Sequence, residues 1–254
     1  FEFLVRGTQM LCSLRDKGCP LVAPDIRPPE EKAFDAKGLY NPCVALKIDE
    51  PIVPNDLSFD ENATIYVLSG PNRGGKSVIT CAVGLAQVML QLGMYLPAEQ
   101  IAISPVDGIY THFPTGAEDT IDKGRLGEEC ARLSEIIDCV TAQSLVLLDE
   151  SLSSTGSYEA SYIAAEVLSG LAHIGCRCLF STHLHELAAE IEELDRKSRA
   201  SGGAPIDTLV AGMETGGKRS FKICRAKPDG KSYARDIAKS YGLTYDDILR
   251  RIQE

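Results

Sequence analysis

The distribution of apolar and polar residues predicts helix, connector and strand in turn along the first part of the chain. Residues 1–18 have apolar side chains at helical spacing, which predicts a helix. Prolines between residues 20 and 29 predict a connector that is not helical throughout. From about residue 40 the pattern becomes that of strands, since "CVALKID" (43–49) alternates and "ATIYVLSG" (63–70) is a short apolar run.

A long uncharged segment, 78–96, is close to the length of a membrane span. Gln87, Gln91 and Gly93 interrupt its apolar character, and a glycine-rich loop precedes it directly. We therefore predict a buried helix, and no membrane association.

The middle of the chain has the pattern of a parallel α/β sheet. "SLVLLDES" (144–151) is an apolar run that ends in two carboxylates. A segment with helical periodicity follows and ends at Gly175, and "CRCLFSTH" (176–183) is a further apolar run that ends in His183. Strand, helix and strand in this order predict parallel strands, whose carboxyl ends form the ligand-binding edge.

Three segments follow towards the end of the chain. "EIEELDRKSRASGGAPID" (190–207) is charged and then small and polar, which predicts a mobile loop. "TLVAGMETGGKRSFKICRAK" (208–227) predicts a β-hairpin that turns at Gly216 and Gly217. The last residues, 232–254, predict one or two short helices.

Composition is that of an ordinary globular protein, with 44% hydrophobic and 24% charged residues among 254. The net charge of -10 argues against a chain that grips nucleic acid by itself, although residues 218–254 carry an excess of Lys and Arg. The nine cysteines are odd in number and lack Cys-x-x-Cys pairs, which favours reduced thiols in a cytoplasmic protein. The chain begins without Met, so we expect a fragment of a longer protein.

The stretch "SGPNRGGKSVIT" (69–80) has the pattern of a phosphate-binding loop between a strand and a helix. Its glycines allow backbone N–H groups to approach a phosphate, and the helix N-terminus favours negative charge. Lys76 is expected to reach the β- and γ-phosphates, and the Ser77 hydroxyl to bind Mg²⁺. The predicted nucleotide-binding residues are Gly70, Pro71, Asn72, Arg73, Gly74, Gly75, Lys76, Ser77 and Val78.

Asp149 and Glu150 follow an apolar run in the manner of a Walker B strand. In this interpretation Asp149 holds Mg²⁺, and Glu150 orients or deprotonates the attacking water. His183 ends the next strand, where an imidazole can contact the γ-phosphate. Lys76, Glu150 and His183 are thus the candidate catalytic residues, and Ser77 and Asp149 the candidate metal ligands. The adjacent Asp and Glu favour an ABC-type ATPase over a kinase or a GTPase.

Several motifs together resemble the C-terminal ATPase domain of the MutS DNA mismatch-repair family. They are "VPNDLSF" (53–59), "SGPNRGGKS" (69–77), "LPAEQIAISPVDGIYT" (96–111), "SLVLLDES" (144–151), "STGSYEA" (154–160), "GCRCLFSTHLHEL" (175–187) and "SYARDIAKSYGL" (232–243). Their order and spacing match from about residue 40 to the end. The "GPN" of the loop and the "THLHEL" after the third apolar run are more distinctive than either Walker motif.

The resemblance implies a P-loop NTPase of the ABC-ATPase type, with a mainly parallel sheet flanked by helices and an antiparallel β portion. It implies ATP and Mg²⁺ as cofactors, and a homodimer with ATP sites at the interface. It also implies DNA binding through N-terminal domains that are absent here. Residues 1–39 would then be the helix and connector to those domains, and 40–254 the ATPase domain.

The sequence departs from the family pattern at three places, one of which is "SLSSTGS" (151–157), where the family has a loop richer in Gly and Arg. The family's signature helix presents hydroxyls to a partner's γ-phosphate, whereas "DKGRLGEECARLSEI" (122–136) has Leu126 and Gly127 there, followed by Glu128 and Glu129. A helix N-terminus at Gly127 would still offer backbone N–H groups. Arg73 stands where the family often has Met, and either adds charge to a phosphate or projects into solvent.

The leading hypothesis is a motor domain that binds and hydrolyses ATP and couples the ATP state to DNA mismatch repair or recombination. The altered signature helix motivates an alternative, a nucleotide-gated dimerisation switch with negligible turnover. Another ABC-type, DNA-associated ATPase is a weaker alternative, because the sequence shows neither LSGGQ nor long heptads.

Overall fold

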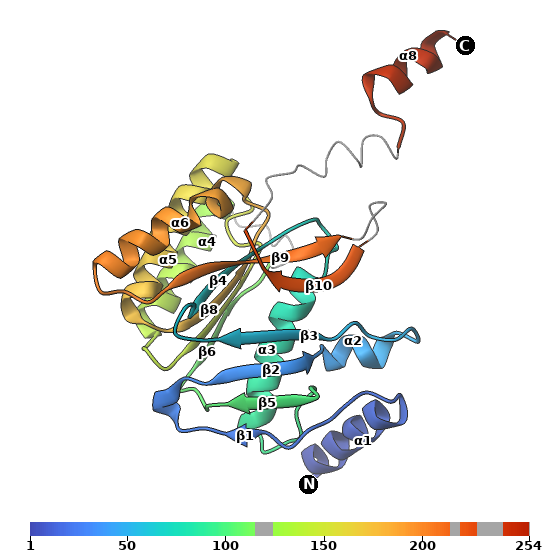
Figure 1. The fold of residues 1–254 in the computed structure, drawn as a ribbon, viewed down its shortest axis with the longest axis vertical. Helices are drawn as coiled ribbons and strands as arrows, with labels where there is room; N and C mark the ends of the chain where they lie inside the picture. Colours follow the sequence, from blue (N-terminus) through green and yellow to red (C-terminus); the bar gives the residue numbers. More distant parts are fainter. Residues whose placement is uncertain (115–123, 214–218, 228–240, 254) are drawn as a thin grey trace.

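The computed structural model describes residues 1–114, 124–213, 219–227 and 241–253, which form two β-sheets and their covering helices (Figure 1). A four-stranded sheet has the order β1–β5–β2–β3, and a six-stranded sheet has the order β10–β9–β4–β8–β7–β6. The strands are β1 Asp25–Ile26, β2 Phe34–Leu39, β3 Asn55–Phe59, β4 Ile65–Ser69, β5 Gln100–Ile103, β6 Ile109–His112, β7 Leu145–Asp149, β8 Arg177–Ser181, β9 Ile206–Met213 and β10 Arg219–Arg225.

Helices α3, α4, α5 and α6 cover the two sides of the six-stranded sheet. Helix α3 lies between the two sheets, and α4, α5 and α6 cover the other face of the larger sheet (Figure 1). Helices α1 and α2 pack on each other beside the smaller sheet, where Leu14, Tyr40 and Ala45 form a separate small core. The helices are α1 Glu2–Asp16, the 3-10 helix Pro29–Glu31, α2 Pro42–Lys47, α3 Lys76–Gln91, α4 Gly124–Cys139, α5 Ser157–Ile174, α6 His185–Ala200 and α8 Tyr245–Gln253.

Alternating side chains of the central strand β4 explain this layering. Tyr66 and Leu68 point into the core that α3 shares with both sheets, and Ile65 and Val67 point into the core beneath α4, α5 and α6. β4 is parallel to β8 and β9, and β7 is parallel to β6 and β8, whereas β10 is antiparallel to β9. The predicted strands at 63–70, 144–151 and 176–183 and the parallel sheet are therefore confirmed.

Helix α3 confirms the predicted buried helix. It is in close contact with the larger sheet at Gly84, where a Cβ atom would stand 2.6 Å from Leu147 Cδ1. Within the described residues, none of the helices combines the length and the apolar character that crossing a membrane requires.

The prediction of a strand at 43–49 is wrong, because this segment begins as helix α2. Asn41 caps the helix, with its Oδ1 accepting from the backbone N–H of Cys43 and Val44 at 2.9 and 3.2 Å. Pro42 occupies the first helical position, which it favours. At the other end Lys17, the C-cap residue of α1, donates to the carbonyls of Ala45, Leu46 and Ile48. Local capping and this contact from α1 outweigh the alternating pattern.

The loop prediction for 190–207 is also wrong over most of its length, since α6 continues to Ala200. Its charged residues pair along the helix, with Arg199 Nε 2.9 Å from Asp195 Oδ2 and Lys197 Nζ 3.6 Å from Glu193 Oε1. Ile191 and neighbouring apolar residues are buried against the larger sheet. The charge therefore marks a solvent-facing side of a helix.

The hairpin at 208–227 is confirmed as β9 and β10, and α8 confirms a helix near the end of the chain. The turn at Gly216 and Gly217, and residues 232–240 of the closing motif, lie outside the described residues. β1 and β2 pair with β5, so part of the predicted connector contributes two strands to the smaller sheet.

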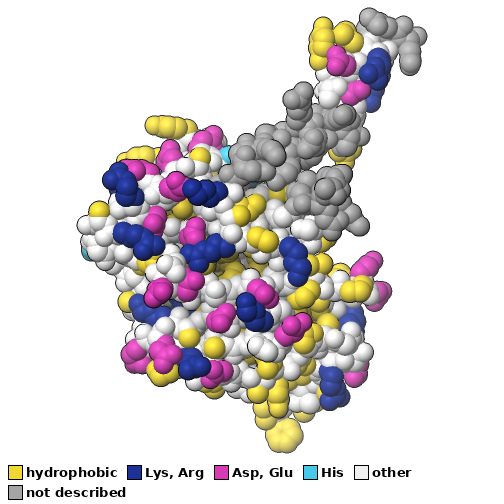
Figure 2. Space-filling model, viewed as in Figure 1, with side chains coloured by type: hydrophobic (Ala, Val, Ile, Leu, Met, Phe, Trp, Pro, Cys, Tyr) yellow, Lys and Arg dark blue, Asp and Glu magenta, His cyan; other side chains and the backbone are white. Residues whose placement is uncertain are grey.

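The surface shown in Figure 2 has Lys and Arg side chains interspersed with Asp and Glu over the sheets and helices. All nine cysteines are free, as expected, and Cys176 and Cys178 are buried.

Candidate functional site

The 70–75 loop connects β4 to α3 at the carboxyl edge of the larger sheet, as predicted. Gly70 has φ +132° and lies so close to β9 that an added Cβ would stand 2.8 Å from Ala211 Cβ. Gly75 has φ +94° and forms the N-cap of α3. Both positions need glycine, the first for space and both for their dihedral angles. Of the other predicted binding residues in the loop, Asn72 and Arg73 are exposed, and Pro71 and Gly74 are buried.

Lys76 is buried at the start of α3, and its ammonium group lies on the loop. Nζ donates to the carbonyl oxygens of Gly70 and Pro71 at 3.1 and 3.3 Å. Burial lowers the pKa of Lys76, while the nearby carboxylates of Glu150 and Asp149 act in the opposite direction. The structure thus brings Lys76 together with both predicted acids.

Asp149 ends β7 with its side chain buried among hydroxyl groups. Burial raises the pKa of its carboxyl, and hydrogen bonding from the Ser77 and Ser181 hydroxyls opposes that shift. Its Oδ1 atom is buried without a hydrogen-bond partner among the described residues. A carboxylate oxygen with a free lone pair beside a serine hydroxyl is a donor set that suits Mg²⁺. Among the described residues, no three or more His, Cys, Asp or Glu side chains are grouped so that they could hold a metal ion by themselves, so phosphate and water oxygens would have to complete such a site.

Glu150 follows immediately and is held in an unusual backbone conformation. Its φ is +47°, a left-handed value that is uncommon outside glycine, and its N–H donates to Ser181 O at 2.8 Å. Its side chain is partly exposed and borders the cavity described below. Glu150 therefore faces the space beside the loop while Asp149 faces inward.

The predicted histidine His183 lies two residues beyond the end of β8, at the same carboxyl edge. Its ring is exposed and makes no hydrogen bond to another described residue. His173 is exposed on α5, and His185 begins α6. His112, in contrast, is buried at the end of β6 and contacts Ser151.

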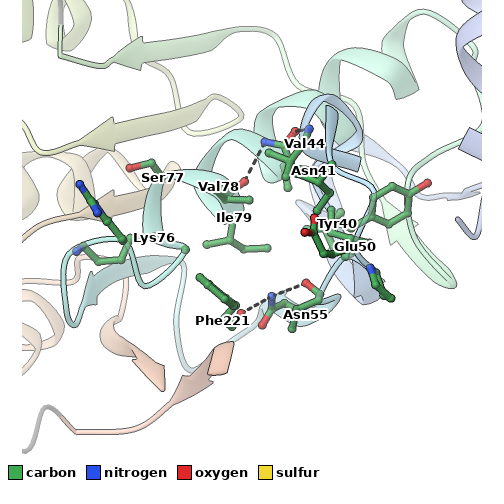
Figure 3. Close-up of a pocket in the computed structure, with 18 of the residues that line it drawn as sticks. Tyr40, Asn41, Val44, Glu50, Asn55, Lys76, Ser77, Val78, Ile79 and Phe221 are labelled. Atoms are coloured by element: carbon green, nitrogen blue, oxygen red, sulfur yellow. Dashed lines mark hydrogen bonds between the residues drawn. The ribbon is translucent and has the colours of Figure 1, made fainter. Parts of the chain in front are cut away.

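A cavity of about 570 Å³ adjoins the loop and the N-terminus of α3 (Figure 3). The loop side of its lining includes the predicted residues Arg73, Gly75, Lys76, Ser77 and Val78, together with Glu150. Figure 3 shows Asn41 and Val44 on one side of Ile79, which belongs to α3, and Phe221 on another. Asn41 lies in the β2–α2 connection and Val44 in α2, whereas Phe221 lies in β10, far from both in the sequence. Most of the cavity wall is apolar, with polar groups at the loop and, on the other side, at Asn41, Glu50 and Asn55.

Asn55 and Phe221 are site residues that sequence reasoning did not single out, although Asn55 lies in a quoted motif. Phe221 has φ +55°, within a register shift between β10 and β9, and its side chain is 45% exposed at the cavity. Asn55 is buried and holds this shift, because Nδ2 donates to Phe221 O at 3.1 Å and Oδ1 accepts from Ile223 N at 2.7 Å. Since this contact joins β3 to β10 across the chain, no local pattern indicates it.

Helix α4 corresponds to the predicted signature helix and is described from Gly124 onward, so Gly127 lies within its first turn and not at its N-terminus. Leu126 is partly buried and packs on the core beneath α4, α5 and α6. The carboxylate of Glu129 accepts a hydrogen bond at 2.9 Å from Ser154, in the loop that follows Glu150. At least one of the two unexpected acids is therefore engaged within its own chain.

Comparison with known proteins settles the family. The model of MutS domain V matches residues 66–207, from the second residue of β4 into β9. The chain belongs to the MutS family. The DNA mismatch repair protein MutS of Chlorobium chlorochromatii is 34% identical over 214 residues, which cover 82% of this chain and 23% of that protein. Msh6 of Gallus gallus is 36% identical over 190 residues, and human Msh6 is 35% identical over 188 residues. The aligned part of this chain spans less than a quarter of each of these relatives, including 14% of either Msh6.

Proposed function

We propose that this MutS-family chain binds ATP with Mg²⁺ and hydrolyses it, as a P-loop domain of the ABC-ATPase type. The observation that carries the proposal is the convergence of Lys76, Asp149 and Glu150 at one glycine-rich loop, beside a cavity of about 570 Å³. Triphosphate and nucleoside need different surroundings, and this site offers a polar end and an apolar end that adjoin each other.

The triphosphate would lie on the 70–75 loop, where α3 begins. Its backbone N–H groups and helix N-terminus favour an anion, and Lys76 would exchange the carbonyls of Gly70 and Pro71 for phosphate oxygens. The nucleoside would enter the apolar cavity, with the Phe221 ring against one face of the base. Asn55 would act indirectly, by holding the backbone of Phe221.

The chemistry assigned to the chain is the positioning of water and the neutralisation of charge. Glu150 borders the cavity and would orient the attacking water and accept its proton. Ser77 and Asp149 would hold Mg²⁺, which supplies charge neutralisation on the phosphates when bound. Lys76 would stabilise charge on the transferred phosphoryl group, and His183 would contact the γ-phosphate after movement of its exposed ring.

The biological setting proposed here is DNA mismatch repair or recombination. MutS and Msh6 relatives carry the name of DNA mismatch repair proteins, and this chain aligns with only a part of each. In this proposal the domain pairs with a second copy of itself, DNA is bound by other domains of the intact protein, and the protein acts in the cytoplasm.

Steady-state phosphate release by the E150Q variant tests the proposed function. Because Glu150 is assigned to the attacking water and not to binding, turnover should be abolished while the Kd for Mg-ATP changes less than about threefold. Glu190, exposed on α6, provides the matched control E190Q, which should keep full turnover. Equal turnover by wild type and E150Q would remove Glu150 from its role.

A nucleotide-gated dimerisation switch is the second candidate, favoured by the absence of hydroxyls at Leu126 and Gly127 in the first turn of α4. Specific activity measured against protein concentration separates the two candidates. Activity that rises with concentration indicates hydrolysis by a dimer. ATP-dependent dimerisation with almost no phosphate release indicates the switch.

A further inference from the structure

A buried contact joins the strand β6 to the residue after Glu150. His112 is 2% exposed, and its Nδ1 lies 2.7 Å from the hydroxyl oxygen of Ser151, which is 3% exposed. The Ser151 hydroxyl is also 3.3 Å from the carbonyl oxygen of His112. His112 is aligned with Leu148 on the adjacent strand β7. The contact therefore connects the carboxyl end of β6 to the turn that follows β7.

The contact holds a turn whose backbone is unfavourable by itself. Glu150 and Leu152 both have positive φ, +47° and +64°, and neither is glycine. Such conformations persist when the surroundings determine them, and they gather at functional sites. Three restraints act here: the Glu150 N–H on Ser181 O, the burial of Leu152, and the contact of Ser151 with His112.

Helix α4 contacts the loop that continues from this turn. Ser154 donates to Glu129 of α4 at 2.9 Å. Burial lowers the pKa of His112 to about 4, and the positive charge of Arg132 on α4 acts in the same direction. The imidazole is therefore neutral at neutral pH, and its Nε2 atom is buried without a partner among the described residues. The ring is a fixed, uncharged hydrogen-bonding group between β6, α4 and the turn.

We propose that His112 is a positioning residue for Glu150, acting through the Nδ1 contact with Ser151 that fixes the 150–152 turn. The inference rests on the proposed hydrolysis of ATP, which it deepens. His112 does not face the cavity and takes no part in nucleotide binding. Its loss changes the orientation of the Glu150 carboxylate and leaves the loop, Lys76 and the cavity in place.

Two substitutions of nearly equal shape test the proposal. Asn can place a polar atom where Nδ1 stands, whereas Leu has the same branching and no hydrogen-bonding group. H112L should lower kcat for ATP at least tenfold, with the KM and the Kd for Mg-ATP within about twofold of wild type. H112N should restore kcat to within about threefold. A residue that served only to fill the core would give no such division between kcat and KM and no rescue by Asn.

S151A removes the other side of the contact and deletes only one oxygen, so it serves if H112L fails to fold. It should reproduce the loss in kcat, and the H112L/S151A double variant should be no slower than the worse single variant, because both remove one interaction.

Several outcomes overturn the inference alone: H112L or S151A with wild-type kcat, equal loss in H112N and H112L, or loss of ATP binding together with turnover. A wild-type chain that shows no hydrolysis overturns the proposed function, and the positioning role with it. If the wild-type chain hydrolyses ATP and E150Q does not, the proposed function stands, whatever the His112 variants show.

Discussion

The cavity beside the 70–75 loop has one side made from a single stretch of chain and another assembled from several. The loop side follows the order of the sequence, from β4 through the loop into α3. The opposite side combines the β2–α2 connection, α2, the residues before β3, and Phe221 of β10. The first side carries the polar groups that suit phosphate, and the second carries mainly apolar side chains, together with Asn41, Glu50 and Asn55. The comparison shows that local sequence encodes the polar chemistry, whereas the apolar wall depends on how distant segments pack.

Measuring the binding of Mg-ATP against Mg-tripolyphosphate separates the two sides, because tripolyphosphate has no nucleoside. The largest effect is expected for K76M on the loop side, since a charge-assisted hydrogen bond contributes about 1.5–3 kcal/mol. Affinity for both ligands should fall roughly 100-fold. K197M, at an exposed lysine of α6, should change neither. Loss of ATP binding alone would contradict the placement of Lys76 on the phosphates.

N55A is the corresponding test of the opposite side of the cavity. It leaves Phe221 O and Ile223 N without their partner, which should lower the free energy of unfolding by about 2 kcal/mol. ATP affinity should fall about tenfold and tripolyphosphate affinity should stay unchanged, as measured by calorimetry and urea unfolding. The exposed Asn62 gives the control N62A. A parallel fall in tripolyphosphate affinity would show that Asn55 supports the loop and not the base.

F221A removes the ring and keeps the hydrogen bonds of Asn55 to the backbone of β10. Stacking of a base on an aromatic ring contributes roughly 1 kcal/mol or more, so ATP affinity should fall about fivefold while tripolyphosphate binding is unaffected. Because Phe221 is 45% exposed, the melting temperature should change little. Unchanged ATP affinity would place the base elsewhere in the cavity.

The smallest effect is expected for R73M. Arg73 is exposed and borders the cavity, so its charge is screened by solvent. If it adds charge to a phosphate, both ligands should bind about twofold more weakly at low salt, and the difference should vanish at high salt. Equal affinities of wild type and R73M at low salt would show that the Arg73 side chain projects into solvent.

The same contrast explains which parts of the molecule the sequence predicts. β4, α3, β7 and β8 each form from one contiguous pattern, and the positions of Lys76, Asp149 and Glu150 follow from their ends. The segment 43–49 alternates like a strand, but the Asn41 cap and Pro42 start a helix there. A helix in the charged segment near 190 escaped prediction, because its buried residues are few among paired charges.

The apolar wall of the site had no local signal for a different reason. Phe221 has an unremarkable sequence context, and its position depends on Asn55, which is more than one hundred and sixty residues earlier. A contact of that kind arises only when β3 and β10 meet in the folded chain. Similarly, the pairing of His112 with Ser151 depends on two strands becoming neighbours in the sheet.

Helix α3 has a mechanical consequence for any response to nucleotide. It shares one core with both sheets, and at Gly84 it is so close to β7 that even a methyl group would collide with Leu147. Close-packed surfaces of this kind do not slide past each other gradually. We therefore expect the two sheets and α3 to travel as a single rigid block. A response to a bound phosphate is then expected in individual side chains at the carboxyl edge, such as the exposed imidazole of His183, and not in a shift of one sheet against the other.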